Sequence, residues 1–171
     1  MDVAIVRFDK DYQVLQDFLP VEQMMRVNLP ANGNDTIYSP SIREALRMVD
    51  ERRRLYARLA APYKPWILFI TDGAPNSSDD ISTVAAEIRS KMSAGDLSFR
   101  SLAVGNFESS ALHRLSPIVL RLQDQNFTDY FDWVAKSMAR VSRSTPGQAQ
   151  QEVNLGGNVR IDQDMSRFNN M

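Results

Sequence analysis

The stretch that decides the fold is Pro65-Trp66-Ile67-Leu68-Phe69-Ile70-Thr71-Asp72-Gly73-Ala74-Pro75, where a continuous apolar run ends on a carboxylate, a glycine and a proline. An unbroken apolar run of this length is typical of a strand at the centre of a parallel sheet, covered by helices on both faces. In such sheets, ligands bind where the carboxyl ends of the strands open into loops. We therefore expect Asp72 to lie at a position suited to binding or chemistry.

Strand and helix patterns alternate on either side of this run. Two short strands joined by a polar turn are predicted at 3–8 and 12–18, and a helical pattern covers about 40–60. Beyond the central run, the pattern predicts a helix at 80–94, a strand at 97–104, a short helix at 111–115, a strand at 118–122 and a helix at 127–141 with Phe131, Val134 and Met138 on one face. This order predicts an α/β fold with a doubly wound, mostly parallel sheet flanked by helices.

The start of the 40–60 helix carries a recognisable signal. Ser39 is suited to capping and Pro40 to the first helical position. The outer face of this helix carries an arginine cluster with the acidic neighbours Asp50 and Glu51, which favours a solvated face over an anion site. The cluster consists of Arg52, Arg53, Arg54 and Arg58.

Composition narrows the classes of function. A formal net charge of -1 and a pI near 5.8 argue against a nucleic-acid-binding domain, because such domains carry a basic stripe. The chain has no cysteine, which excludes disulfides and thiolate metal sites. The first residues lack a signal-peptide pattern, and every apolar run is far shorter than the ~20 residues that span a bilayer. We expect a cytoplasmic protein that binds neither membranes nor nucleic acid.

The composition changes near the C-terminus. We expect one domain over residues 1–147 and a polar tail or small appendage over 148–171. Within the tail, Gly156 and Gly157 fit the two-residue turn of a tiny hairpin, although an isolated hairpin is marginal in water and a disordered tail is an equal alternative.

Two loops of the predicted fold are rich in oxygen ligands. The first contains Asn32, Asn34, Asp35 and Thr36, and the second contains Thr71, Asp72, Asn76 and Ser77. Carboxylate and hydroxyl oxygens are the ligands that Mg²⁺ prefers, so the two loops together could form part of a cation site. Asp and Thr at such positions also serve as helix caps and turn residues, and the spacing alone leaves both interpretations open.

Motifs in a fixed order resemble those of a known family. The matching residues are Thr36, Ile42, Ala45, Leu46, Arg53, Tyr56, Tyr63, Pro65-Trp66-Ile67, Thr71-Asp72-Gly73-Ala74-Pro75, Ala103-Val104-Gly105, Phe131-Asp132-Trp133 and Val141-Ser142-Arg143-Ser144-Thr145-Pro146-Gly147. Together they resemble the stand-alone bacterial von Willebrand factor A (vWA) proteins, small cytoplasmic proteins associated with tellurium-resistance and stress gene clusters. The resemblance covers most of residues 1–147.

The resemblance implies a function in protein recognition and no enzymatic activity. Members of the family hold Mg²⁺ or Mn²⁺ in a metal-ion-dependent adhesion site, whose cation completes its shell with an acidic group of a partner protein. Carried over residue by residue, Thr36 matches the threonine ligand and Asp72 the aspartate ligand of that site. Asp35, which precedes Thr36 where the family usually has glycine, is expected to be a turn residue.

The chain departs from the family at one important place. The Asp-x-Ser-x-Ser loop, the central first strand before it and the helix after it have no counterpart, because residues 3–8 match the family's second strand. This predicts two strands, at 3–8 and 65–71, with unpaired edges. A truncated reading frame is the favoured explanation; a partner chain that supplies the strand, or closure of the gap by the remaining strands, are the alternatives. Insertion of the tail hairpin is disfavoured. We expect this chain alone to bind cation weakly or not at all.

Two other functions remain as alternatives. One is a cation-independent scaffold in which Thr36 and Asp72 are ordinary loop residues. The other is a metal-dependent hydrolase, but Ile70 occupies the position where a haloacid-dehalogenase-type phosphatase has its nucleophilic aspartate. His113 is the single histidine, and we expect it to be a surface or cap residue.

Overall fold

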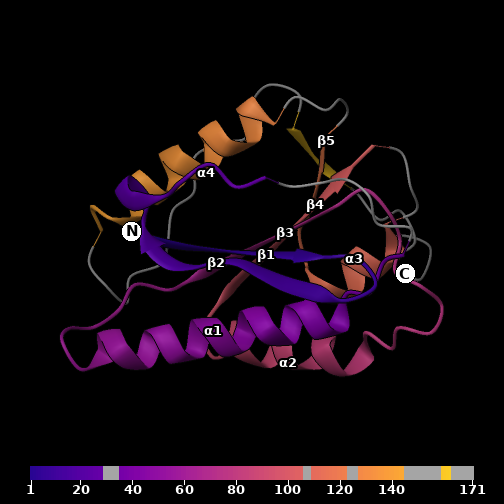
Figure 1. Ribbon diagram of the computed structural model, residues 1–171, viewed down its shortest axis with the longest axis horizontal. Helices are drawn as coiled ribbons and strands as arrows, with labels where there is room; N and C mark the ends of the chain where they lie inside the picture. Colours follow the sequence, from indigo (N-terminus) through magenta and orange to yellow (C-terminus); the bar gives the residue numbers. More distant parts are fainter. Residues whose placement is uncertain (29–34, 106–108, 123–126, 145–158, 163–171) are drawn as a thin grey trace, which may run out of the picture.

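The computed structural model describes residues 1–28, 35–105, 109–122, 127–144 and 159–162, which form an α/β fold with two separate sheets (Figure 1). The first sheet is an antiparallel pair, β1 (Asp2–Phe8) and β2 (Tyr12–Pro20). The second has the order β3 (Trp66–Thr71), β4 (Ser98–Val104), β5 (Val119–Leu122) and β6 (Val159–Asp162), parallel except for β6. The predicted hairpin and the mostly parallel sheet are thus confirmed.

Helices cover both sides of the strands (Figure 1). They are α1 (Ser39–Ala57), α2 (Ser82–Ser93), α3 (Ser110–Leu115) and α4 (Thr128–Val141), with a 3-10 turn η1 at Val21–Gln23. The helices α1 and α2 lie on one side, and α4 lies on the other. Among the described residues, no helix combines the length and apolar character needed to cross a membrane.

The deciding apolar run forms β3 and contributes to a core on each face. Ile67 and Phe69 are buried and pack in the cluster that also contains the inner residues of α1 and α2. Trp66 and Ile70 point the other way, into the cluster around Trp133 of α4. Because successive side chains of a strand alternate in direction, both faces need apolar residues, and the first five positions of β3 are all apolar. The need for apolar side chains on both faces explains why the apolar run of the sequence is continuous.

The buried face of α4 differs from the predicted one. The residues that α4 buries are Tyr130, Trp133, Ser137 and Val141. Phe131 is 50% exposed, and its neighbours Val134 and Met138 are half-buried at the margin of the contact. The helix carries two adjacent apolar stripes, and the tilted packing of the Trp133 ring on Trp66, at 6.0 Å between centroids, selects the stripe that contains Trp133.

The two sheets do not join. Among the described residues β1 pairs only with β2, and β3 pairs only with β4, so no strand closes the gap between them. The predicted unpaired edges are present, and closure by the remaining strands is not observed. The one described part of the tail, β6, pairs with β5 at the far edge of the second sheet, so it does not fill the gap. The hairpin turn predicted at 156–157 lies outside the described residues.

Side chains hold the first sheet in place. Asp2 at the start of β1 accepts hydrogen bonds from Tyr56 and Arg52 of α1. The hydrogen bond from Tyr56, and then that from Arg52, hold the pKa of the Asp2 carboxyl below its usual value. The Arg52 guanidinium also lies 5.7 Å from the Phe18 ring centre of β2. At the other end of β1, the Phe8 ring stacks on Phe69 at 4.9 Å.

Candidate functional site

The loops that carry Thr36 and Asp72 meet at the carboxyl edge of β3. The backbone N–H of Asn76 donates to the Thr36 carbonyl at 2.8 Å, which ties the second loop to the first. A Cβ atom built on Gly73 would lie 3.7 Å from Thr36 Oγ1, so the threonine hydroxyl stands against the loop that follows β3. Residues 29–34, which include Asn32 and Asn34 of the predicted ligand loop, lie outside the described residues.

Both predicted ligand side chains remain available for a ligand. Asp72 is exposed, and Thr36 is half-buried. Within the described part of the chain, neither the Asp72 carboxylate nor the Thr36 hydroxyl takes part in a hydrogen bond or ion pair. Asp35 and Asn76 differ, because the Asn76 amide donates to the Asp35 carboxylate. That contact ties the two loops together, a role different from the turn residue expected of Asp35.

A buried tyrosine supports the Asp72 loop from below. The Tyr38 hydroxyl donates to the Gly73 carbonyl and lies 3.5 Å from Thr71 Oγ1. Thr71 Oγ1 in turn accepts from the Gly73 N–H at 3.3 Å. Burial, with a smaller contribution from the negative charges of Asp72 and Asp79, raises the pKa of Tyr38 to about 12. The phenol therefore stays protonated and acts as a fixed donor that shapes the loop.

The N-terminus of α1 is capped from a distant loop. Asp79 Oδ2 accepts from the backbone N–H groups of Tyr38 and Ser39, at 2.5 and 3.1 Å. The expected cap, Ser39, is wrong: Ser39 is already helical, and its hydroxyl lies 3.3 Å from the Asp80 carbonyl. Asp79 stands 40 residues further along the chain, so no local pattern could have identified it.

Replacing Asp79 with alanine is expected to lower the free energy of unfolding by about 1–2 kcal/mol, because two N–H groups at the start of α1 lose their acceptor. Urea denaturation followed by circular dichroism measures the change. Asp72→Ala is the matched control: it removes an exposed carboxylate from the same loop and should leave stability within about 0.5 kcal/mol. Equal losses for the two variants would contradict the assigned cap.

The residues present fit a cation only in part. Asp72 offers one carboxylate and Thr36 one hydroxyl, whereas the Asp79 carboxylate and the Thr71 hydroxyl are engaged in holding the loops. Among the described residues, no group of three or more histidine, aspartate or glutamate side chains is arranged to hold a metal ion. Mg²⁺ needs near-octahedral oxygen coordination, so most of its shell would have to come from water or from a partner. The pair fits a partial site.

A second polar cluster, which sequence analysis did not find, joins β5, α3 and β6. The Asp162 carboxylate accepts from Arg121 Nη2 at 2.9 Å and from the Ser109 hydroxyl, and lies 3.7 Å from His113 Nε2. Burial raises the pKa of Asp162, but the hydrogen bonds from Arg121 and Ser109 outweigh it and hold the pKa below its usual value. The expectation for His113 was a surface or cap residue. Its side chain is only 10% exposed, and the caps of α3 are Ser109 and Ser116, so neither expected role is observed.

This cluster does not have the geometry of a catalytic triad. The Ser109 hydroxyl donates directly to the carboxylate of Asp162, so the serine is held as a structural donor and is itself 8% exposed. The cluster fastens β6 to the edge of the sheet. Asp162 lies 41 residues beyond Arg121, so no local spacing motif links it to the other members of the cluster.

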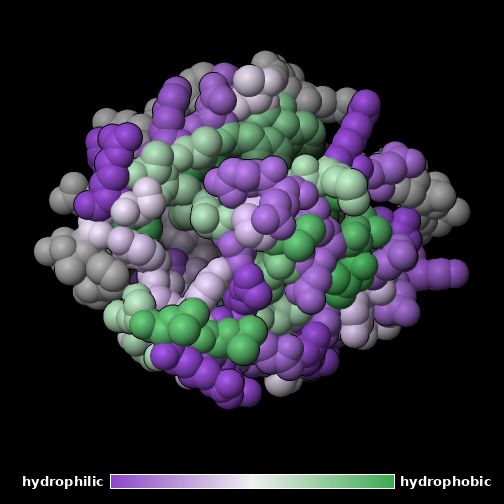
Figure 2. Space-filling view, turned by 60° about the vertical axis from the view of Figure 1, so that its left-hand side comes forward, coloured by the Kyte–Doolittle hydropathy of each residue, from purple (hydrophilic) through white to green (hydrophobic). Residues whose placement is uncertain are grey.

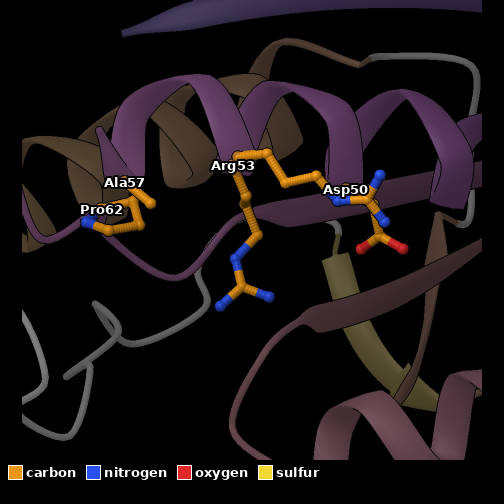
Figure 3. Close-up of a pocket in the computed structure, with 5 residues that line it drawn as sticks. Asp50, Arg53, Ala57 and Pro62 are labelled. Atoms are coloured by element: carbon orange, nitrogen blue, oxygen red, sulfur yellow. The ribbon is translucent and has the colours of Figure 1, made fainter. Parts of the chain in front are cut away.

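Two of the four clustered arginines form ion pairs, and the other two, Arg54 and Arg58, are exposed, as expected of a solvated face. Arg53 donates to Asp96 at 2.9 Å, and Arg52 donates to Asp2. The neighbouring Asp50 accepts from Lys91 at 2.7 Å. Figure 3 shows the shallow pocket of about 390 Å³ on this face, lined by Asp50, Arg53, Arg54, Ala57 and Pro62. Its charges are mostly engaged by neighbours, which leaves the carboxyl edge of β3 as the better candidate.

Comparisons of the chain with protein-family models, with curated proteins and with solved structures find no match.

Proposed function

We propose that the chain is a protein-recognition module of the vWA type, with Thr36 and Asp72 as a partial metal-ion-dependent adhesion site. The observation that supports this most is the meeting of the two loops at one edge, with both side chains unengaged by the described residues. The carboxyl edge of a parallel sheet is also where α/β proteins place their ligand sites. The sequence resemblance adds a setting, bacterial stress and tellurium-resistance signalling.

Recognition would proceed without bond breaking. When Mg²⁺ or Mn²⁺ is bound, it supplies a positive centre that an acidic side chain of a partner can ligate. Asp72 would contribute the carboxylate and Thr36 the hydroxyl, and the buried Tyr38 would keep the Asp72 loop in a fixed position. Because one carboxylate balances little of the cation's charge, affinity in the absence of the partner is low.

A second candidate function is a scaffold that binds its partner without a cation. One observation favours it. Among the described residues at this edge, Asp72 offers the single carboxylate that is not engaged in a hydrogen bond, because the Asp79 carboxylate caps α1. In this case Thr36 and Asp72 are loop residues, and the resemblance reflects ancestry.

Mn²⁺ titration separates the two functions. We expect a dissociation constant on the order of 1 mM or weaker for the chain alone, because most ligands are water. Paramagnetic broadening in ¹H–¹⁵N spectra should appear first at residues 36–38 and 72–74. Asp72→Asn should abolish this local broadening, whereas Asp132→Asn, an exposed carboxylate on α4, should leave it unchanged.

The other outcomes are equally informative. Broadening spread evenly over all acidic residues, unchanged in Asp72→Asn, would reject the cation site and favour the scaffold. A tight stoichiometric complex would contradict the expectation of weak binding and show that the chain supplies more ligands than Thr36 and Asp72.

A further inference from the structure

The C-terminal end of α1 carries two leucines that lie in solvent. Leu55 is 50% exposed, and Leu59, just beyond the helix, is 84% exposed, the largest value among the exposed large hydrophobic residues that the structure describes. The N–H groups of Leu59 and Ala60 both donate to the Tyr56 carbonyl, so the chain keeps a helical course to this point. The two leucines therefore lie one turn apart on one face. Single exposed leucines are ordinary on protein surfaces, so the pair gains meaning from what lies beside it.

Two arginines lie beside these leucines. Arg54 and Arg58 are exposed, and within the described part of the chain neither guanidinium group takes part in a hydrogen bond or ion pair. Side chains three and four positions apart are neighbours on a helix, so Arg58 lies next to both Arg54 and Leu55. The two guanidinium groups and the two leucines thus form one continuous surface. We call Arg54, Leu55, Arg58 and Leu59 the α1-end surface.

A recess adjoins the α1-end surface. It is the shallow pocket of about 390 Å³ lined by Asp50, Arg53, Arg54, Ala57 and Pro62 (Figure 3). Asp50 and Arg53 in its wall are already ion-paired, whereas Arg54 is not. Figure 2 shows hydrophobic and hydrophilic side chains side by side over this end of the helix. The free positive charge therefore lies between a recess and an apolar surface.

These features define the chemistry of a partner. Guanidinium groups bind carboxylates, often through two parallel hydrogen bonds, so Arg54 and Arg58 are complementary to a pair of acidic side chains. The exposed leucines offer contact area for apolar side chains next to those carboxylates. The recess has room for a projecting side chain of the partner. A partner that meets all three conditions is an acidic segment with apolar side chains on an adjacent stripe.

The same surface is less suited to a lipid bilayer. Surfaces that bind anionic lipids carry clusters of about four to eight basic side chains. On α1, the exposed Glu51 lies on the same outer face and pairs with Arg47 at 2.5 Å, so negative charge is interspersed with positive charge. A bilayer surface also cannot enter the recess. A polypeptide therefore fits the observed charges and shape better.

We propose that the α1-end surface binds an acidic, amphipathic segment of a partner protein, with the two arginines on its carboxylates and the two leucines against its apolar side chains. The helix rises about 1.5 Å per residue, so this surface lies about 25 Å from the start of α1, where the Thr36 loop enters. The contact is thus separate from Thr36 and Asp72, and it does not depend on a cation.

The test uses the full chain and a synthetic helical peptide of about 15 residues, with glutamates on one stripe and leucines on the adjacent stripe. Binding is followed by ¹H–¹⁵N chemical shifts, and the shifts should change most at residues 53–59. Raising the NaCl concentration from about 50 to about 300 mM should weaken binding at least about threefold, because salt screens exposed charges. A peptide with glutamine in place of glutamate should bind at least about fivefold more weakly.

Variants of the chain locate the contact. Combined Arg54→Glu and Arg58→Glu should weaken binding of the glutamate peptide at least about tenfold, because two attractions become repulsions. Arg43→Glu is the matched control: it reverses an exposed arginine at the other end of α1 and should leave the affinity unchanged. Asp72→Ala should also bind the peptide normally, which distinguishes this proposal from the cation site.

Four results would overturn the proposal. Two are the absence of shift changes at millimolar peptide and equal affinity for the glutamate and glutamine peptides. Tighter binding to vesicles that contain phosphatidylserine than to the peptide would assign the surface to a membrane. A dimer in sedimentation that the double arginine variant abolishes would assign it to a second copy of the chain. Because the peptide comparison uses the wild-type chain, failure of a variant to fold cannot obscure the outcome.

Discussion

Phe69→Ala is expected to lower the free energy of unfolding by about 3–5 kcal/mol, the usual cost of removing a buried phenylalanine. Phe69 is 5% exposed and its ring contacts those of Phe8, Tyr38 and Phe99, with centroids 4.8–6.1 Å apart. The loss of unfolding free energy should exceed the free energy of transferring the phenyl group from the core to water, because three aromatic neighbours would then border a cavity. Urea denaturation measures the change.

The same substitution at Phe131 is the matched control. Phe131 lies on the outer face of α4 and is 50% exposed, so Phe131→Ala should cost less than about 1 kcal/mol. A cost comparable with that of Phe69→Ala would mean that Phe131 packs inward, as the sequence pattern suggested, and would contradict the orientation of α4.

Asp162→Ala is expected to cost about 2–4 kcal/mol, because Arg121 and Ser109 would lose their carboxylate acceptor in a poorly solvated site. The Arg121 side chain is 19% exposed and that of Asp162 is 18% exposed. Arg160→Ala, on an exposed position of the same strand, is the control and should change stability by less than about 0.5 kcal/mol. If the two variants lose equal stability, the cluster is not what fastens β6.

The effect of Asp162 should depend on pH. Its pKa is lower in the folded chain than the ~3.9 of an unfolded one, so the ionised carboxylate stabilises the fold above that value. This contribution is lost as the pH falls through the folded pKa. The stability difference between wild type and Asp162→Asn should therefore be full at pH 7 and shrink below about pH 4. A difference that is constant from pH 7 to pH 3 would contradict the assignment.

Elements with a clear periodicity were predictable from the sequence alone. The helix predicted at 80–94 is α2, and the apolar residues that recur there at helical spacing, Ile81, Val84, Ala85 and Ile88, are all buried. The same holds for β3, where side chains on both faces pack in apolar clusters and the run from Trp66 to Ile70 is apolar throughout. The residues of a buried face recur at a regular spacing in the local sequence, even though the residues that they contact are distant. A buried face can therefore be predicted from the sequence.

Polar contacts were less predictable because they join distant segments. The Asp79 cap of α1 and the Arg121–Asp162 pair span 41 residues each, and neither pairing leaves a mark in the local sequence. The buried face of α4 was predicted wrongly for a different reason. The helix has two neighbouring apolar stripes with the same helical period, and only tertiary packing selects between them. For the candidate site, the resemblance identified Thr36 and Asp72, and the structure shows that the loops that carry them meet.

The division of the strands into two hydrogen-bonded groups also bears on how the molecule unfolds. The antiparallel pair of β1 and β2 shares no backbone hydrogen bond with the strands of the larger sheet. It is attached to the rest of the protein through Phe8 and Phe18, which pack against the core, and through the Asp2 and Asp9 contacts. Regions with separate backbone networks open as separate cooperative units. Unfolding would then have two stages, and the antiparallel pair of β1 and β2 would unfold before the rest of the protein.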